Sequence, residues 1–266
     1  MASWLQIYRL WPQHIPAPLA VLYDKVAAPG LSRFHRQIAR EIASAVAGGT
    51  VLDIGTGPGH LLVEIARSAP ELKLVGFDLS RKMLSMAKAV IEQDTGRMVS
   101  TVDADASANA ERTDSDSIRL IHGDVRNLPF ADGAFDLVVS TLSMHHWHDP
   151  SEGIRQCSRI IAPGGRCWIY DLRTDVWPGN YKSLLTGGRI ASTIRSWIFK
   201  FHGVKPRHYK PSAIASWLGG GVTVRVDVHP AYLKLIIEKP HHALENHPAA
   251  SSISTPSKSP STLALS

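Results

Sequence analysis

The chain is poor in cysteine: it has two, Cys157 and Cys167, and they do not form a Cys-x-x-Cys pair. The sequence therefore suggests neither a disulfide nor a cysteine-based metal motif. Long apolar runs are missing as well, since none approaches the roughly 20 residues that a membrane-spanning helix needs. The first residues lack the uninterrupted apolar core of a signal peptide, because Gln6, Arg9 and Pro12 break it. We therefore expect a cytoplasmic protein without a transmembrane segment.

Acidic residues are fewer than basic ones, 23 Asp and Glu against 29 Lys and Arg, which gives a formal net charge of +6. Basic residues concentrate between positions 195 and 210, where aromatic residues alternate with them. A solvated helix face is the plain interpretation of such a cluster. An acidic substrate, or weak peripheral contact with an anionic membrane surface, is the sharper alternative. We expect no nucleic-acid partner.

Glycine is concentrated in one short loop of chemical interest. A β-branched, apolar stretch ends at Ile54, then Gly55, Gly57 and Gly59 alternate, and an apolar helical pattern begins at Leu61. Glycine has no Cβ, so it takes positive φ readily and lets a ligand lie directly on the main chain. A strand, a glycine-rich turn and a helix N-terminus form a nucleotide-sized site at the carboxyl edge of a parallel sheet. The sequence therefore predicts a small nucleotide-like cofactor.

The spacing of these glycines disfavours a dinucleotide. The dinucleotide fingerprint is G-x-G-x-x-G, whereas here the third glycine comes one residue early and His60 follows it. An acid, Asp53, precedes the loop and suits a cationic ligand. This run resembles motif I of the class I S-adenosylmethionine-dependent methyltransferases, (D/E)-x-G-x-G-x-G, and its small-molecule, UbiE-like branch. The resemblance implies S-adenosyl-L-methionine as cofactor, with contacts from Asp53, Gly55, Thr56, Gly57 and Gly59.

The resemblance continues at the ends of two further predicted strands. Asp78 ends the first, and an acid there accepts hydrogen bonds from a ribose diol in doubly wound folds. The family pattern adds Leu79 and places Met83 beside the adenine, although a role for Met83 in the apolar core is the alternative. Asp124 follows the second strand and matches the family acid that accepts the adenine amino group, with Val125 supplying a backbone amide. An ordinary turn role for Asp124 stays open.

Strand and helix patterns alternate over residues 50–172, which predicts a doubly wound α/β fold. Ahead of them, an apolar residue recurs every four positions at Phe34, Ile38, Ile42 and Val46, which predicts a helix that packs on the sheet.

A further helix is predicted to start at Asp149, with Asp149 as its cap and Glu152 as the capping-box acid. Its predicted buried stripe is Ile154, Cys157 and Ile161. We expect a helix stop and a tight turn at residues 161–165, and then a strand from Arg166 to Leu172. A helix at 211–218 and two adjoining strands at 222–229 and 231–239 follow. Together they agree with the family's closing hairpin. We therefore expect a three-layer, Rossmann-like methyltransferase fold with a seven-stranded, mostly parallel sheet and an antiparallel last strand.

The predicted methyltransferase domain covers residues 33–239, after an irregular N-terminal segment at 1–32. Residues 95–117 are rich in Asp, Ser, Ala and Thr without apolar periodicity, and we interpret them as a flexible insertion. The segment of residues 173–209 is too long for a simple link, and we predict that it forms a substrate lid. Residues 240–266 are expected to form a disordered tail.

Candidate catalytic residues cluster after the predicted fourth strand, whose end at Ser140 the resemblance assigns to the cofactor. Loops at strand carboxyl ends face the ligand crevice, and an imidazole there titrates in the range that a general base needs. We name His145 and His146 as catalytic candidates, while structural hydrogen bonding or lining of the pocket remains the alternative. A metal held by these two, His148 and Asp149 would strain one short loop, so no metal is predicted. Secondary candidates for substrate contact are Tyr170 and Asp171.

The class of acceptor molecule can be narrowed by the sequence motifs that this chain lacks. The strand that ends near residue 140 is followed by Ser-Thr-Leu-Ser rather than by the Asn/Asp-Pro-Pro-aromatic run of base-methylating enzymes. The double-glutamate loop of arginine methyltransferases and the acidic triad of the catechol type are also missing. In-line methyl transfer to a small molecule, at O, N or C, remains, and the aromatic residues of the lid (Trp177, Trp197, Phe199 and Phe201) predict an apolar or aromatic acceptor. A nicotinamide-dependent oxidoreductase and a non-catalytic binding scaffold are the alternatives.

Overall fold

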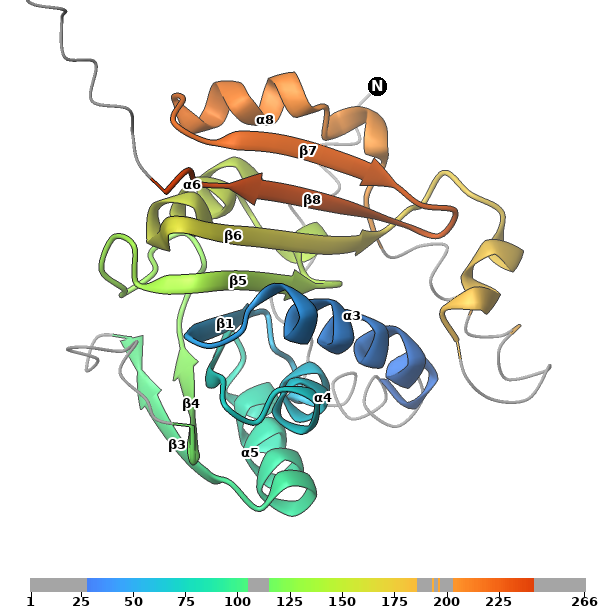
Figure 1. Cartoon of the computed structure of the whole chain (residues 1–266). Helices are drawn as coiled ribbons and strands as arrows, with labels where there is room; N and C mark the ends of the chain where they lie inside the picture. The colour runs from blue at the N-terminus through green and yellow to red at the C-terminus, as the bar shows by residue number, and fades with distance from the viewer. Residues whose placement is uncertain (1–27, 105–114, 186–192, 194–195, 197–202, 242–266) are drawn as a thin grey trace, which may run out of the picture.

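The computed structural model describes residues 28–104, 115–185, 193, 196 and 203–241 of the chain, which form one sheet with helices on both faces (Figure 1). The predicted tail after residue 241 lies outside the described residues. So do the N-terminal residues before 28 and the lid residues Trp197, Phe199 and Phe201.

The sheet of the described residues has eight strands in the order β3-β4-β2-β1-β5-β6-β8-β7. Neighbours from β3 to β6 are parallel, whereas β8 is antiparallel to both β6 and β7. This topology confirms the predicted doubly wound fold with an antiparallel last strand. The strands are β1 (Thr50–Ile54), β2 (Lys73–Asp78), β3 (Met98–Asp103), β4 (Ser117–His122), β5 (Phe135–Thr141), β6 (Ile161–Leu172), β7 (Thr223–Val228) and β8 (Tyr232–Glu238).

The prediction of seven strands was wrong by one, because β3 is an additional edge strand inside the stretch predicted to be flexible. It pairs with β4 in parallel register from Met98 opposite Ser117 to Asp103 opposite His122. An edge strand buries little side-chain surface, and here only Val99 is buried. The segment therefore needs no apolar pattern, and its Val and Thr residues suit extended backbone. Residues 105–114 of the predicted insertion lie outside the described part.

Helices pack against the sheet in two layers (Figure 1). The apolar stripe of Phe34, Ile38 and Ile42 holds the first helix against one face, as the sequence predicts. Because successive side chains of β1 point to opposite faces of the sheet, Val51 lies in that core and Leu52 lies in the core on the opposite face. One face carries α3 (Ser32–Ala45), α4 (His60–Ser68) and α5 (Arg81–Thr95), and the other carries α6 (Pro150–Ile160) and α8 (Pro211–Leu218). Four 3-10 helices are also described: η2 (Ala28–Leu31), η4 (Met144–His146), η5 (Pro178–Ser183) and η6 (Pro206–His208).

The junction between α6 and β6 differs from the predicted helix stop followed by a strand from Arg166. Ile161 already pairs with Phe135 of β5, and the ladder resumes only at Arg166 opposite Leu137. The intervening Ala-Pro-Gly-Gly segment bulges out of the ladder, with Gly164 at φ 79°. The predicted turn is therefore an irregularity within β6, and the last buried residue of α6 is Ile160 instead of Ile161.

The predicted cap of α6 is formed in part. The carboxylate of Asp149 accepts hydrogen bonds from the backbone N–H groups of Ser151 and Glu152 at 3.1 Å each. The capping-box acid, Glu152, instead accepts from Gln156 at 3.0 Å and pairs with Arg155. The cap therefore depends on Asp149.

Replacing the cap tests how much α6 depends on it. We expect Asp149→Ala to lower the free energy of unfolding by about 1 kcal/mol, since two helix N–H groups lose their acceptor. Urea denaturation followed by circular dichroism measures this. Asp132→Ala, which removes an exposed acid paired with Arg159 outside any helix cap, is the control and should cost less. Equal losses in the two variants would contradict the assigned cap.

Candidate functional site

Polar side chains collect where the parallel strands β1, β2, β4, β5 and β6 end. Because all five run in the same direction, their last residues meet at one edge of the sheet. The edge carries most of the residues that the sequence singles out. Those at the strand ends and in the loops that follow are Asp53, Gly55, Thr56, Gly57, Gly59, Asp78, Leu79, Asp124, Val125, Ser140, His145 and His146.

The glycine loop after β1 is fastened to the neighbouring strand. The backbone N–H groups of Gly55 and Thr56 both donate to the carbonyl of Phe77, at 2.7 and 3.1 Å. The N–H of Gly57 donates to the carboxylate of Asp78 at 2.8 Å. The three glycines have φ values of 69°, 54° and 80°, in the left-handed region that favours glycine. The loop is thus held against the end of β2.

Two glycines of this loop have different surroundings. A Cβ on Gly55 would lie 2.2 Å from Oγ of Ser143, so the loop after β5 requires glycine there. A Cβ on Gly57 would have nothing within 4 Å. Gly57 therefore faces open space, which is the place where a ligand can approach the main chain.

Asp53 is a fully buried acid of the site. One carboxylate oxygen accepts a hydrogen bond from Oγ1 of Thr56 at 2.8 Å, and the other, Oδ1, has no partner. Burial, together with the nearby charge of Asp78, raises the pKa of Asp53 to about 7. A buried acceptor without a partner is costly, and it marks a group that a ligand can satisfy.

The end of β2 presents an acid whose oxygens are already oriented. Asp78 accepts from the N–H of Gly57 through one oxygen and from the N–H of Ser80 through the other, at 2.8 Å each. Burial raises the pKa of Asp78. Leu79 is exposed at 36%, whereas Met83 is buried on the inner side of α5. The predicted contact of Met83 with adenine therefore stays a prediction beside its observed place in the core.

After β4, Asp124 forms an ion pair that its position in the sequence did not predict. Its carboxylate accepts from the guanidinium of Arg126, with a closest distance of 2.6 Å. These hydrogen bonds lower the pKa of Asp124, so the carboxylate stays ionised. A carboxylate has about four lone-pair positions, so it keeps capacity for a second donor. Val125 is partly buried next to it.

The end of β5 holds a hydrogen-bonded cluster that sequence reasoning missed, apart from Ser140. The hydroxyls of Ser140 and Ser143 lie 3.1 Å apart, and Nε1 of Trp147 donates to Ser143 at 2.9 Å. Between them Leu142 has φ 53°, a strained value for a residue other than glycine. The turn is thus forced into position over Gly55. In the sequence, the only signal for this cluster is the run of polar residues that follows a buried strand.

His145 is hydrogen-bonded to a residue near the end of a different strand, β6. Its Nδ1 lies 2.8 Å from Oδ1 of Asp171, and its backbone N–H donates to Oδ2 of the same residue at 2.9 Å. The His145 side chain is 8% exposed and that of Asp171 is fully buried. Because a carboxylate only accepts, Nδ1 carries the proton and Nε2 is the basic nitrogen of the neutral ring. The ring of His146 lies 4.0 Å from that of His145.

The two secondary candidates face away from each other. Asp171 supports His145, whereas Tyr170 donates through its hydroxyl to Glu41 of α3 at 2.8 Å. Among the described residues, no group of three or more His, Cys, Asp or Glu is arranged to hold a metal ion. Within the same part of the chain, no helix has the length and apolarity to cross a membrane.

Known proteins match this chain over the same region. Residues 52–169 match a family model described as "Methyltransferase domain". A demethylmenaquinone methyltransferase of Deinococcus radiodurans is 30% identical over 56% of this chain and 54% of its own length. A ubiquinone/menaquinone biosynthesis C-methyltransferase of Geotalea daltonii is 27% identical over 59% of this chain and 60% of its own length. The chain thus spans less than two thirds of either relative.

Solved structures share the fold. A protein of Methanococcus maripaludis, described as a candidate S-adenosyl-L-methionine-dependent methyltransferase, has a TM-score of 0.61 at 23% identity, over 86% of this chain and 95% of its own. The plantazolicin methyltransferase BpumL, in complex with a triazolic desmethylPZN analog and SAH, has a TM-score of 0.56 at 15% identity, over 89% of this chain and 94% of its own. At these identities the likeness is one of fold.

The raised pKa of Asp53 predicts how stability depends on pH. The folded protein holds this proton up to about pH 7, whereas an unfolded aspartate loses it near pH 4. Stability should therefore fall as pH rises from about 4 to 7 and then level off, by as much as about 4 kcal/mol from this group.

Urea denaturation of the wild type and of Asp53→Asn between pH 4.5 and 8 measures that contribution. The Asn variant should have a shallower downward slope, because position 53 then has no proton to lose, whereas Asp78 still does. Asp132→Asn, at a side chain that is 78% exposed, serves as control and should follow the wild type. Parallel curves for the wild type and Asp53→Asn would contradict the raised pKa.

Proposed function

We propose that this chain is a class I S-adenosylmethionine-dependent methyltransferase of the UbiE-like type, and that it methylates a small-molecule acceptor. The methyl donor is S-adenosyl-L-methionine, which supplies a methyl group on a positively charged sulfur. The observation that carries the proposal is the unpartnered oxygen of Asp53 beside the open face of Gly57. The nicotinamide alternative has no support from the relatives.

The residues at the sheet edge fit this cofactor. Its ammonium and sulfonium charges favour an ionised acid, so binding near Asp53 lowers the pKa that burial raises. Gly57 admits the amino-acid part of the cofactor against the main chain. Asp78 accepts from the ribose hydroxyls, and Asp124 and the amide of Val125 bind the adenine. Contacts from Gly55, Thr56, Gly59, Leu79, Met83 and Ser140 complete the proposed cofactor site.

Asp124 needs one adjustment in this arrangement. Its carboxylate already binds Arg126, so the adenine amino group must share it with the guanidinium or displace one of its hydrogen bonds. The ionised form is the one that accepts from an amino group, and Arg126 keeps the carboxylate in that form. Arg126 is thus a positioning residue for the acid in our proposal.

The chain then has to orient the acceptor for in-line displacement and exclude water. Orientation alone lowers such a barrier by about 7–11 kcal/mol. When the acceptor must lose a proton, a general base adds a factor of about 10²–10⁴. We assign that role to Nε2 of His145, because Asp171 fixes the ring with the proton on Nδ1. His146 is then a neighbour that lines the pocket.

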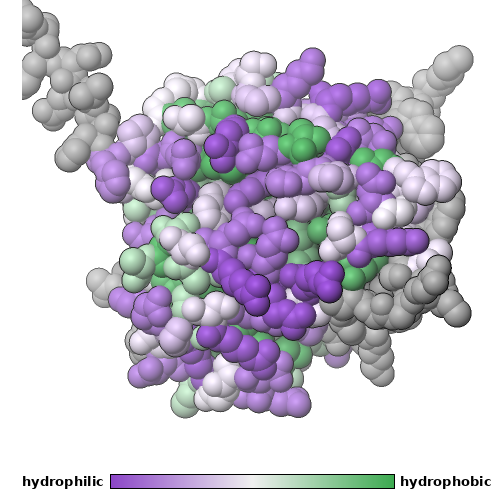
Figure 2. All heavy atoms as spheres, turned by 45° about the vertical axis from the view of Figure 1, so that its right-hand side comes forward, coloured by the Kyte–Doolittle hydropathy of each residue, from purple (hydrophilic) through white to green (hydrophobic). Residues whose placement is uncertain are grey.

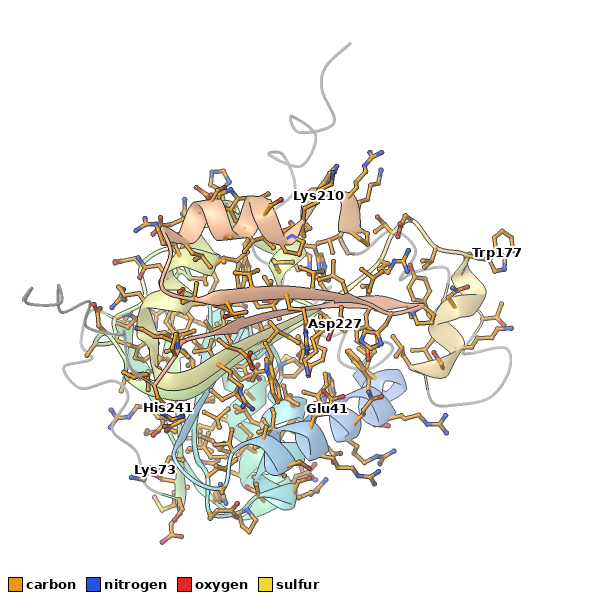
Figure 3. All side chains as sticks on the ribbon, turned by 45° about the horizontal axis from the view of Figure 1, so that its top comes forward. Glu41, Lys73, Trp177, Lys210, Asp227 and His241 are labelled. Carbon is orange, nitrogen blue, oxygen red and sulfur yellow. The ribbon has the colours of Figure 1, made fainter. Side chains whose placement is uncertain are left out.

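The acceptor that this site suits is an apolar or aromatic molecule with an ionisable proton. Two relatives are named for methylation in quinone biosynthesis, one of them as a C-methyltransferase. A base next to the reacting atom would serve a hydroxyl or an activated carbon. Trp177, at 72% exposure, lies in the described part of the proposed lid (Figure 3). Tyr181 of η5, in the same segment, is buried.

The glycine loop offers a test of the cofactor site with a closely matched control. Gly57→Ala and Gly96→Ala both place a Cβ at positive φ, 54° and 70°, and neither Cβ meets an atom within 4 Å. Both should lower stability by about 1 kcal/mol. Only Gly57→Ala should weaken binding of S-adenosyl-L-methionine by calorimetric titration, about tenfold or more, or about 1.4 kcal/mol. Equal affinities in the two variants would remove Gly57 from the cofactor site.

Two variants test the proposed base. His145→Asn should lower kcat by about 10²–10⁴-fold, and Asp171→Asn should lower it less, because the ring remains but loses its orientation. The KM for the cofactor should change little in either variant. His148→Asn, in the same loop, is the control. If both variants kept the kcat of the control while remaining folded, His145 would have only a structural role.

Incubating a cell extract with the enzyme and methyl-labelled cofactor identifies the acceptor. The proposal expects label in an apolar or aromatic small molecule, and less label with Gly57→Ala when the cofactor is not saturating. Tight cofactor binding without label transfer would favour a non-catalytic scaffold. Thermal stabilisation by NADH and not by S-adenosyl-L-methionine would favour the oxidoreductase.

A further inference from the structure

A second hollow lies away from the edge of the sheet that carries the proposed cofactor site. It has a volume of about 870 Å³ and opens between α3 and strands β6 and β8. Its lining from the strands is Trp168, opposite Val139 of β5, and Lys234, opposite Tyr170 of β6. None of the residues that line the hollow belongs to the proposed cofactor site or to the catalytic candidates. Figure 3 shows Glu41 between α3 and this part of the sheet. The hollow is therefore separate from the proposed methyl-transfer site.

Three arginines of α3 line it. Arg33, Arg36 and Arg40 follow one another at intervals of three and four residues, which places them on one side of the helix. The row is about 10 Å long at 1.5 Å per residue. Within the described residues, none of the three guanidinium groups has a hydrogen bond or an ion pair. Like charges so spaced repel one another, so the row lowers helix stability unless an anion lies beside it.

The acids near this row are already neutralised. Glu41 accepts from Nζ of Lys234 at 2.8 Å and from the hydroxyl of Tyr170 at the same distance. On β7, Asp227 lies in register with Lys234 and forms an ion pair with Arg225 at 3.2 Å. The arginine row therefore keeps its full positive charge.

The floor of the hollow is formed by the ring of Trp168 and the side chain of Lys234. Nζ of Lys234 lies 3.9 Å from the centre of the Trp168 ring, and Trp168 is 7% exposed. Hydrophilic side chains extend across the middle of the face in Figure 2, with hydrophobic ones between them. A charged row above a partly desolvated floor binds an anion more strongly than the same row on a convex surface in water.

We propose that this hollow binds a phosphate-bearing ligand through Arg33, Arg36 and Arg40. A guanidinium presents a planar pair of donors that matches two oxygens of a phosphate, and it is weakly hydrated compared with an ammonium. Three such groups over about 10 Å suit a ligand with two or more phosphates, or one phosphate of a larger molecule. The volume is in the range of small-molecule sites. The phosphate comes from a soluble compound or from a lipid headgroup.

The experiment uses the full chain and two probes. Calorimetric titration with inorganic pyrophosphate, at low and at physiological salt, tests a soluble phosphate. Sedimentation with vesicles of phosphatidylglycerol and phosphatidylcholine, against vesicles of phosphatidylcholine alone, tests a headgroup. The variant is Arg36→Gln with Arg40→Gln. Its control is Arg67→Gln with Arg155→Gln, which removes the same charge from exposed arginines paired elsewhere.

The wild type and the control should bind at least one probe, and the Arg36/Arg40 variant should bind it about tenfold more weakly or worse. Binding of pyrophosphate identifies a soluble ligand, and binding of anionic vesicles alone identifies a headgroup. No binding of either probe, or an equal loss in the control, would overturn the proposal. Titration with S-adenosyl-L-methionine should be unchanged in all variants, which shows that they are folded and keeps this result separate from the proposed methyl transfer.

Discussion

Burial of one carboxyl group at the end of β1 constrains the whole candidate site. Asp53 has no exposed surface and lacks a partner for Oδ1, and Asp78 stands near it. The two acids are held by the same loop, through Thr56 on one side and the N–H of Gly57 on the other. Burial disfavours the ionised form of both acids, so a ligand that brings positive charge is favoured because it stabilises that form. The loop that holds the two acids and the positive charge of the proposed cofactor are therefore linked by the same electrostatic requirement.

The sequence predicted the local parts of this site and missed the long-range ones. The glycine loop, the acid that ends β2 and the cap at Asp149 depend on residues close together in the chain, where turn chemistry and capping rules act. The ion pair of Asp124 with Arg126 is also local, but either partner could have turned to solvent. Strand β3 was missed because an edge strand needs few apolar residues. Pairing with β4 through backbone hydrogen bonds leaves no pattern in the side chains.

Contacts between separate strands cannot be predicted from turn chemistry and capping rules. His145 and Asp171 are 26 positions apart, and their meeting requires β5 and β6 to be neighbours in parallel register. The approach of Ser143 to Gly55 likewise requires β1 beside β5. Once the strand order is known, both contacts follow, because parallel neighbours bring their carboxyl ends together. Neither contact leaves a pairwise signal in the sequence, so position at a strand end predicts substrate contact for Asp171 and does not predict its hydrogen bond to His145.

The two faces of β6 carry residues that belong to two different proposed sites. Successive residues of a strand point in opposite directions, so Tyr170 and Asp171 serve different sites. Tyr170 joins Glu41 and Lys234 beneath the arginine row of α3, and Asp171 orients the imidazole at the edge of the sheet. A ligand at the arginine row therefore lies on the side of β6 that carries Tyr170, whereas the proposed base contacts Asp171. Because α3 also packs on α4, which begins directly after the glycine loop, the same helix lies between the proposed cofactor site and the proposed phosphate site.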